Sequence, residues 1–206
     1  MGDFGEHLLV VPRGDDQAHT DTNFLKALLA ALKAHDAYTY RHSLRTVRLS
    51  LLLGRACGVA GRDLRALCLG ALLHDVGKVF VPAAVLHKPG RLTAAEWAAV
   101  KRHPREGARL LAGGAVAAGA LRVVAEHHER WDGRGYPAGL GGAEIDPNAR
   151  VVAVADAFDA MTSARAYRPA GSHQAAVAEL ERCAGTQFDP RVVAAFGRVV
   201  PDLAQA

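Results

Sequence analysis

The chain has few cysteines, and their number and spacing exclude two classes of site. Cys57, Cys68 and Cys183 are odd in number, far apart and without any C-x-x-C pair. Neither a disulfide framework nor a thiolate zinc site is therefore indicated. We expect the three cysteines to be buried apolar residues in a reducing compartment.

Long apolar runs are also missing. No segment approaches the roughly 20 consecutive apolar residues that cross a membrane, and the apolar stretch at 8–12 is too short and poorly flanked for a signal peptide. The sequence therefore predicts a cytoplasmic protein with no membrane partner. Charge of one sign is not concentrated either, because the net charge of +4 comes from scattered arginines. This pattern argues weakly for an anionic ligand and against a tail that binds a nucleic-acid polymer.

Aromatic residues make up 6% of the chain, and alternating strand-like segments are absent. The chain instead contains many short amphipathic runs of Ala, Leu and Val, which are typical of an all-α fold. Its 206 residues fit one domain, and half of them are apolar, which suffices for a core. We predict an N-terminal arm at 1–22 and one helical domain at 23–206.

Helical periodicity and capping signals give approximate bounds for the elements. Asp63 is a suitable N-cap, Thr93 and Glu96 form a capping box, and Pro147 and Pro190 suit first turns. The segment 79–90 reads as a proline-bounded connection that could cover a site as a lid. The expected helices start near 23, 39, 63, 93, 104, 115, 147, 172 and 190, with the third ending at 74, the fourth at 103 and the sixth at 130.

The stretch from Gly70 to Lys78 organises the rest of the chain. An apolar helix ends there in an adjacent His74 and Asp75. A carboxylate at the end of an apolar surface needs a cation, because an unpaired one costs several kcal/mol. Metal ligation is one solution, and a salt bridge to Lys78 is the other. This pair alone does not decide between them.

Further histidines and aspartates favour the metal. Each has an ordinary explanation alone: a boundary histidine, a helix cap, a solvated turn or a paired acid. Together they place one or two donor groups on each of five successive helices, most of them near a helix end. Imidazoles and carboxylates without thiolates suit iron, manganese, zinc or related divalent ions. These additional residues are His42, His103, His127, His128, Asp156 and Asp159.

The number of donors indicates two ions. When Asp159 is set aside, seven ligands remain, which is too many for one ion. Two ions bridged by one carboxylate would use them all, and two-metal sites are suited to the hydrolysis of phosphate esters.

Six motifs carry a resemblance to a known family. They are Tyr-Thr-Tyr-Arg-His-Ser at 38–43, His-Asp-Val-Gly-Lys at 74–78, Lys-Pro-Gly at 88–90, His-Pro at 103–104, His-His-Glu-Arg-Trp-Asp-Gly-Arg-Gly-Tyr-Pro at 127–137, and Asp-Ala-Phe-Asp-Ala-Met-Thr-Ser at 156–163. Over about Asp36 to Phe196 the chain resembles the HD-GYP phosphodiesterases, a branch of the HD-domain metal-dependent phosphohydrolases. The resemblance implies an all-helical fold and hydrolysis of cyclic di-GMP to linear pGpG, and in some members on to GMP.

The resemblance also assigns metal ligands. It implies one ion held by His42, His74, Asp75 and Asp156. The second ion would be held by His103, His127 and His128, with Asp75 bridging the two. His74 and Asp75 are thereby assigned to catalysis together with Lys78, for which the resemblance implies contact with the scissile phosphate.

Substrate contacts are assigned in the same way. Arg165 and Arg168 match positions that contact phosphate or guanine, although the sequence alone would leave both solvated. Tyr136 lies in the turn that gives the family its name and could stack on a base, hydrogen-bond a base or position the loop. In the family this turn also contacts diguanylate cyclase domains, which are therefore an expected partner.

Two residues are expected to support the ligands. Asp159 follows Asp156 by three residues and could orient a ligand, or serve as a cap or salt bridge. Tyr38 precedes His42 by one helical turn, where some HD-GYP proteins have a glutamate that helps to hold a third ion. A neutral phenol cannot replace that carboxylate, so we predict two ions, unless Asp36, Glu126 or Glu129 supplies an acid instead.

The sequence therefore predicts a cyclic di-GMP phosphodiesterase that uses a water activated by two divalent metals. Iron or manganese is favoured, and zinc or nickel is compatible. Two rivals stay open: a cyclic di-GMP receptor or cyclase-interaction module with weak chemistry, and an HD hydrolase of another cyclic nucleotide. The sequence does not decide the metal, the final product, the proton donor, the regulatory input or whether a homodimer forms.

Overall fold

The structure, a computed structural model, describes residues 22–113, 116–164 and 170–203, with 200–203 described by their backbone alone. These residues form helices and turns with no strand among them, so the predicted all-α fold is confirmed. The α-helices are α2 (Thr22–His35), α3 (Ala37–Ala56), α4 (Gly61–Leu73), α5 (Ala83–Leu86), α6 (Ala94–Val100), α7 (His103–Ala112), α8 (Ala118–Glu126), α9 (Pro147–Thr162), α10 (His173–Arg182) and α11 (Pro190–Leu203). The 3₁₀ helices are η1 (Val76–Phe80) and η2 (Gly142–Glu144).

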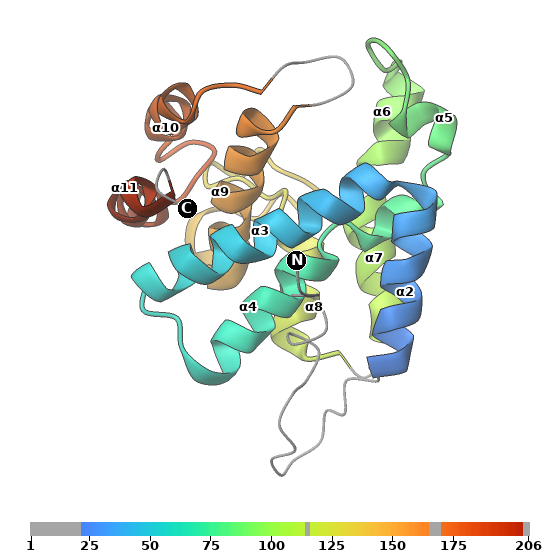
Figure 1. Cartoon of the computed structure of the whole chain (residues 1–206), viewed down its shortest axis with the longest axis horizontal. Coiled ribbons are helices and arrows are strands. Elements are labelled where there is room, and N and C mark those ends of the chain that lie inside the picture. The colour runs from blue at the N-terminus through green and yellow to red at the C-terminus, as the bar shows by residue number, and fades with distance from the viewer. Residues whose placement is uncertain (1–21, 114–115, 165–169, 204–206) are drawn as a thin grey trace.

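Helix α3 crosses the middle of the molecule, and the other long helices are arranged around it (Figure 1). Helix α4 packs against α3 and α8, and α9 packs against α3. Helices α10 and α11 lie at one end, and α5 and α6 lie at the other. The interior is apolar, with Leu67, Val123 and Val152 fully buried. Each such side chain stabilises the fold by about 1.5–3 kcal/mol, and their packing fixes the polar groups on the same helices.

Local caps set several helix starts. Glu96 N–H donates to Thr93 Oγ1 at 3.3 Å and Thr93 N–H donates to the Glu96 carboxylate at 2.7 Å, which confirms the predicted capping box. The prediction for the third helix is wrong, because its N-cap is Ala60 and Asp63 lies in the first turn. There the carboxylate still favours the helix dipole. Helix α3 starts two residues earlier than expected, because Asp36 caps it.

Four further expectations are corrected. The segment 79–90 is not an open connection, since it contains the end of η1 and all of α5. The helix expected at 115–130 ends at Glu126, and the helix expected to reach His103 ends at Val100. Cys57 is exposed at the C-cap of α3 and Cys183 is half-buried, whereas Cys68 is buried as predicted. Within the described ranges, no helix combines the length and the apolar character that crossing a bilayer requires.

Candidate metal centre

Seven histidines and aspartates converge between α3, α4, α7, α8 and α9. His42 lies on α3, His74 and Asp75 follow α4, His103 starts α7, His127 and His128 follow α8, and Asp156 lies on α9. Five of them are at most 4% exposed, and the remaining two, His128 and Asp156, are half-buried. The structure thus brings together all seven ligands that the sequence suggested, from segments far apart in the chain.

Three of the imidazoles are oriented by the helix ends that precede them. The Nδ1 atoms of His74, His103 and His127 lie 2.7, 2.8 and 3.0 Å from the carbonyl oxygens of the residues three positions earlier. The last carbonyls of a helix have no intrahelical donor, so an Nδ1–H there satisfies one of them. With the proton assigned to Nδ1 by this hydrogen bond, each Nε2 lone pair points into the centre.

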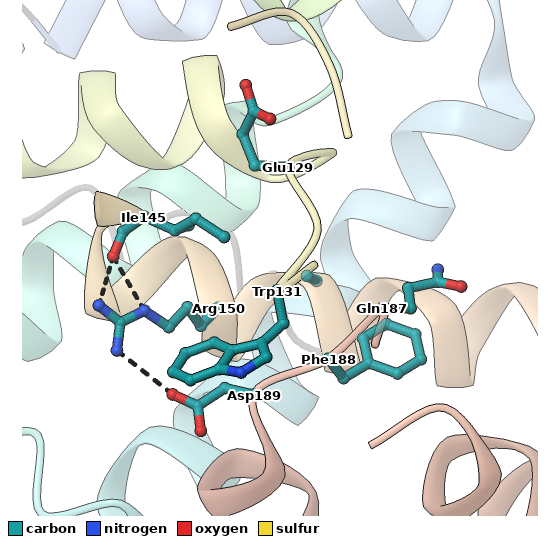
Figure 2. Close-up of a pocket in the computed structure, with 8 residues that line it drawn as sticks. Glu129, Trp131, Ile145, Arg150, Gln187, Phe188 and Asp189 are labelled. Atoms are coloured by element: carbon teal, nitrogen blue, oxygen red, sulfur yellow. Dashed lines mark hydrogen bonds and ion pairs between the residues drawn. The ribbon is translucent and has the colours of Figure 1, made fainter. Parts of the chain in front are cut away.

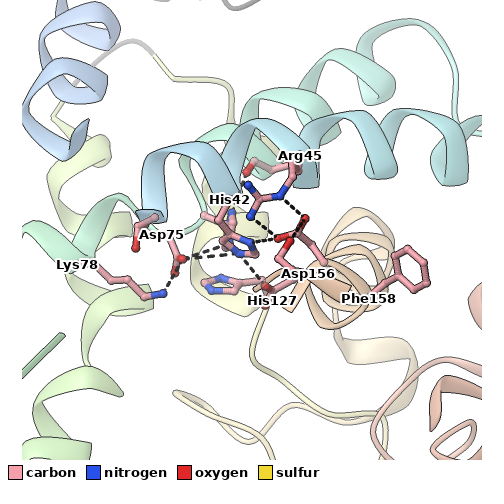
Figure 3. Close-up of polar contacts among 12 residues, drawn as sticks. His42, Arg45, Asp75, Lys78, His127, Asp156 and Phe158 are labelled. Carbon is pink, nitrogen blue, oxygen red and sulfur yellow. Dashed lines mark hydrogen bonds and ion pairs between the residues drawn. The ribbon is translucent and has the colours of Figure 1, made fainter. Parts of the chain in front are cut away.

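The donor atoms form two groups, and Asp75 lies between them. The first group is His42, His74 and Asp156, the second is Asp75, His103, His127 and His128, and atoms within a group lie within 4.8 Å of one another. Asp75 Oδ1 is 3.1 Å from His103 Nε2 in the second group. Its Oδ2 is 3.5 Å from His74 Nε2 and 4.0 Å from His42 Nε2 in the first. Figure 3 shows His42 with Asp75 and Lys78 on one side and Asp156 on the other.

Burial and neighbouring charges set the protonation of these groups. Burial lowers the pKa of His74 and His127, and it lowers the pKa of His128 to about 3 with help from His103. Burial raises the pKa of Asp75, but nearby Lys78 and His74 outweigh it and hold the pKa well below the usual value. Neutral imidazoles and ionised carboxylates are the states that divalent cations require.

His42 differs from the other imidazoles. Burial acts to lower its pKa, but hydrogen bonds to Asp156 and Asp159 outweigh burial and raise the pKa to about 9. Its Nε2 lies 2.9 Å from Asp156 Oδ1. In the protein without an ion, a proton on His42 therefore compensates the negative charge of the two carboxylates.

Several buried atoms in the centre fit a cation. His74 Nε2 and Asp75 Oδ1 have no hydrogen-bond partner among the described residues. His103 Nε2 and His127 Nε2 face each other at 3.2 Å, although each ring already has its proton on Nδ1. Buried acceptors without donors are costly, and a divalent ion would satisfy them. The imidazole and carboxylate donors match iron, manganese or zinc.

Asp159 supports His42 from behind. Its Oδ2 accepts the His42 Nδ1–H at 2.6 Å, which leaves Nε2 directed at the centre. Arg45 binds the same carboxylate, with Nε 2.6 Å from Oδ1 and Nη2 2.9 Å from Oδ2. Sequence reasoning missed Arg45. Its position three residues after His42, on the same face of α3, was the available signal.

We expect Asp159→Ala to weaken metal binding in the first group by about 10–100-fold, the usual effect of losing a carboxylate that orients a ligand histidine. Affinity would be measured by metal titration of the chelator-treated protein. Ser163→Ala is the matched control, because Ser163 Oγ contacts the Asp159 Oδ1 atom at 3.2 Å and does not touch His42. Unchanged affinity in Asp159→Ala would contradict this role.

Lys78 and Tyr38 border the centre. Lys78 Nζ lies 2.6 Å from Asp75 Oδ2, so the salt bridge considered from the sequence is present, and the side chain keeps 22% exposure. The Tyr38 ring lies parallel to the His42 ring, with 6.5 Å between centroids. Tyr38 therefore packs beside a ligand in the first group.

The loop after His128 is held against the centre by backbone hydrogen bonds. Tyr136 N–H donates to the His128 carbonyl at 3.2 Å, and the centroids of the two rings lie 4.8 Å apart. Glu129, which is 4% exposed, accepts from the N–H groups of Ala138 and Gly139 at 2.6 and 3.1 Å. Glu129 thus fixes the loop that carries Tyr136, a positioning role that the sequence did not reveal.

A small pocket lies behind this loop, beside α9 and the residues 187–189 that precede α11. The Arg150 guanidinium stacks over the Trp131 ring at 5.4 Å, donates to the Ile145 carbonyl and pairs with Asp189 at 3.2 Å (Figure 2). None of the seven candidate ligands lines the pocket. Its residues brace the loop, so the metal centre is the stronger candidate for chemistry. Arg165 and Arg168, the predicted substrate contacts, lie outside the described residues.

Comparison with known proteins shows what this chain is similar to. Residues 26–192 match the family described as HD domain. The cyclic di-GMP phosphodiesterase response regulator RpfG of Xanthomonas campestris is 43% identical over 84% of this chain and 47% of its own length. The 3'3'-cGAMP-specific phosphodiesterase 3 of Vibrio cholerae is 33% identical over 96% of this chain and 44% of its own length. This chain therefore spans less than half of either curated relative.

A solved structure shares the fold. Bd1817, an HDG"Y"P protein from Bdellovibrio bacteriovorus, superimposes with a TM-score of 0.68 over 95% of this chain and 67% of that chain, at 20% identity. At this identity the likeness concerns the fold alone.

Proposed function

This chain belongs to the HD domain family and to its HD-GYP branch, and from that premise we propose that it is a metal-dependent phosphodiesterase that hydrolyses cyclic di-GMP to linear pGpG. The observation that carries the proposal is the pair of donor groups with Asp75 between them. Such a pair suits two ions a short distance apart, and centres of this kind cleave phosphate esters.

The proposed ligand sets follow the two groups. His42, His74 and Asp156 would hold one ion, and His103, His127 and His128 would hold the other, with one oxygen of Asp75 directed at each. When bound, two divalent ions supply an activated water and polarise the phosphoryl oxygens. Iron or manganese is the favoured metal.

The chain's own side chains would complete the site. Lys78 places an ammonium beside Asp75 at the edge of the centre, where it can bind the scissile phosphate and offset the charge that builds up during cleavage. Asp159 and Arg45 keep the His42 ring in one orientation. Tyr136 covers one face of the His128 ring and shields that side from water.

Two alternative functions have less support. A receptor or cyclase-interaction module would be expected to lack ligands, whereas this chain retains all seven. Hydrolysis of another cyclic dinucleotide is favoured by one observation, the similarity to a 3'3'-cGAMP-specific phosphodiesterase. Contact with diguanylate cyclase domains through the turn at 135–137 and formation of a homodimer stay predictions.

A substrate panel tests the proposal. The purified protein, loaded separately with manganese and iron, would be assayed with cyclic di-GMP, 3'3'-cGAMP, cyclic di-AMP and pGpG, and products would be separated by chromatography. We expect cyclic di-GMP to give the highest kcat/KM, with pGpG as the first product. Faster turnover of another dinucleotide would replace the substrate assignment, and no turnover of any of them by the metal-loaded protein would refute the proposed activity.

We predict two ions per chain and a third in Tyr38→Glu. The acids that could replace a carboxylate at position 38 are engaged elsewhere: Asp36 caps α3, Glu126 accepts from Asp146 N–H, and Glu129 holds the loop. A glutamate at position 38 would add the anionic oxygen that a further cation needs. Elemental analysis at full occupancy would count the ions, with Tyr38→Gln as the uncharged control. Three ions in the wild-type protein would contradict the prediction.

A further inference from the structure

A lysine and two aromatic rings extend the metal centre on the side of α6. The Lys101 ammonium lies 5.2 Å from the centre of the Tyr136 ring and 5.7 Å from the centre of the Trp97 ring. The Tyr136 ring in turn lies against the ring of the candidate ligand His128, with 4.8 Å between centroids and 31° between the ring planes. The Lys101 ammonium and the candidate ligand His128 thus both contact the Tyr136 ring.

Lys101 differs from Lys78 in its partners. Lys78 is already paired with Asp75 at 2.6 Å. Among the residues that the structure describes, no carboxylate lies within ion-pair distance of Lys101, and its side chain is exposed. Contact with two ring faces holds an ammonium by cation–π attraction without neutralising it. A cation that is held in place but not neutralised beside such a centre is suited to an anionic ligand.

The helix that carries both residues is itself fixed. The capping box of Thr93 and Glu96 starts α6, and Lys88 binds the Glu96 carboxylate at 2.7 Å. Lys101 is the C-cap of this helix, two residues before His103. Trp97, one turn earlier on α6, keeps 46% of its surface exposed. The capped helix α6 and the short connection to α7 thus set the backbone position of Lys101 relative to His103.

We propose that Lys101 binds the second, non-scissile phosphate of the cyclic dinucleotide, with Trp97 and Tyr136 holding its ammonium in place. The inference rests on the proposed function. A cyclic dinucleotide carries two phosphodiesters in one ring, so when one lies at the metal centre the other is displaced by one nucleoside. Lys101 and His128 contact the same Tyr136 ring, and an ammonium beside the centre there supplies a charge-assisted contact to that second phosphate. Lys101 then raises the affinity for substrates with two phosphodiesters and takes no part in the cleavage step.

The test measures binding without turnover. The dissociation constant of the hydrolysis-resistant bisphosphorothioate analogue of cyclic di-GMP would be determined by calorimetry on metal-loaded wild type, Lys101→Gln, Lys101→Arg and Trp97→Leu. We expect Lys101→Gln to weaken binding by about tenfold, as for the loss of one charge-assisted hydrogen bond. Lys101→Arg should restore most of the affinity, and Trp97→Leu should weaken binding by about threefold.

Two controls separate a phosphate contact from a structural effect. Lys33 makes the same kind of contact with Tyr40, at 5.6 Å, on α2, so Lys33→Gln should leave affinity unchanged. Bis(p-nitrophenyl) phosphate has a single phosphodiester, and its inhibition constant should be equal in wild type and Lys101→Gln. Equal affinity of both proteins for the dinucleotide analogue would overturn the inference. An equal loss for both ligands would also overturn it, because a disturbed His103 would weaken both. Binding of the analogue by a wild type that fails to hydrolyse cyclic di-GMP would refute the proposed activity alone.

Discussion

Asp75→Asn is expected to abolish hydrolysis, with kcat reduced by at least about 1,000-fold, because both proposed ions lose the same anionic ligand. Asp75 is 1% exposed, and its two oxygens face the two donor groups at 3.1 and 3.5 Å. Asparagine has the same size but supplies one neutral oxygen in place of the carboxylate. The variant should therefore fold while its metal content falls. Turnover of cyclic di-GMP and metal content would be measured on the same preparation.

The matched control is Asp189→Asn. Asp189 is also buried, at 3% exposure, and is paired with Arg150 and Arg191 away from the centre. Its replacement should lower stability but leave kcat and metal content close to the wild-type values. A well-folded Asp75→Asn protein that retained turnover would rule out Asp75 as the bridging ligand.

Gly77→Ala is expected to lower the free energy of unfolding by about 3 kcal/mol or more, since the added atom meets backbone that cannot rotate away. A Cβ at Gly77 would lie 2.0 Å from the His103 carbonyl oxygen and 2.6 Å from the Gly107 nitrogen. This glycine of the His-Asp-x-Gly-Lys motif thus allows η1 to approach the first turn of α7. Because His103 starts that turn, the variant should also lose metal from the second group. Chemical denaturation and metal analysis would measure the two effects.

Gly197→Ala provides the opposite control. Gly197 lies inside α11, and a Cβ there would meet nothing within 4 Å apart from its chain neighbours and the backbone of its own helix. The substitution should stabilise the protein by about 0.5–1 kcal/mol through helix propensity. If Gly77→Ala were as stable as Gly197→Ala, the close approach of η1 to α7 would be contradicted.

Features with short-range causes were the most predictable. The capping box at Thr93 and Glu96 involves residues three apart, so the sequence contains all of its partners. The predicted helix bounds were wrong where contacts outside the helix decide where it begins or ends. Helix α8 ends at Glu126, before His127 and His128. The His127 ring hydrogen-bonds the carbonyl of Val124 and directs its Nε2 to the centre. The prediction of Asp63 as an N-cap was wrong because α4 begins two residues earlier, at Gly61.

Helical periodicity was enough to predict the all-α class, and residue chemistry with the family motifs was enough to name the seven candidate donors, because both are properties of the chain. The tertiary structure supplied the short distances within each of the two groups that the resemblance implied, since these depend on how α3, α4, α7, α8 and α9 pack. It also decided the partners that act across long sequence separations, such as Asp159 for His42 and Tyr136 for Lys101. Such contacts depend on distances of a few ångströms between residues distant in sequence, and the packing of the whole core sets those distances.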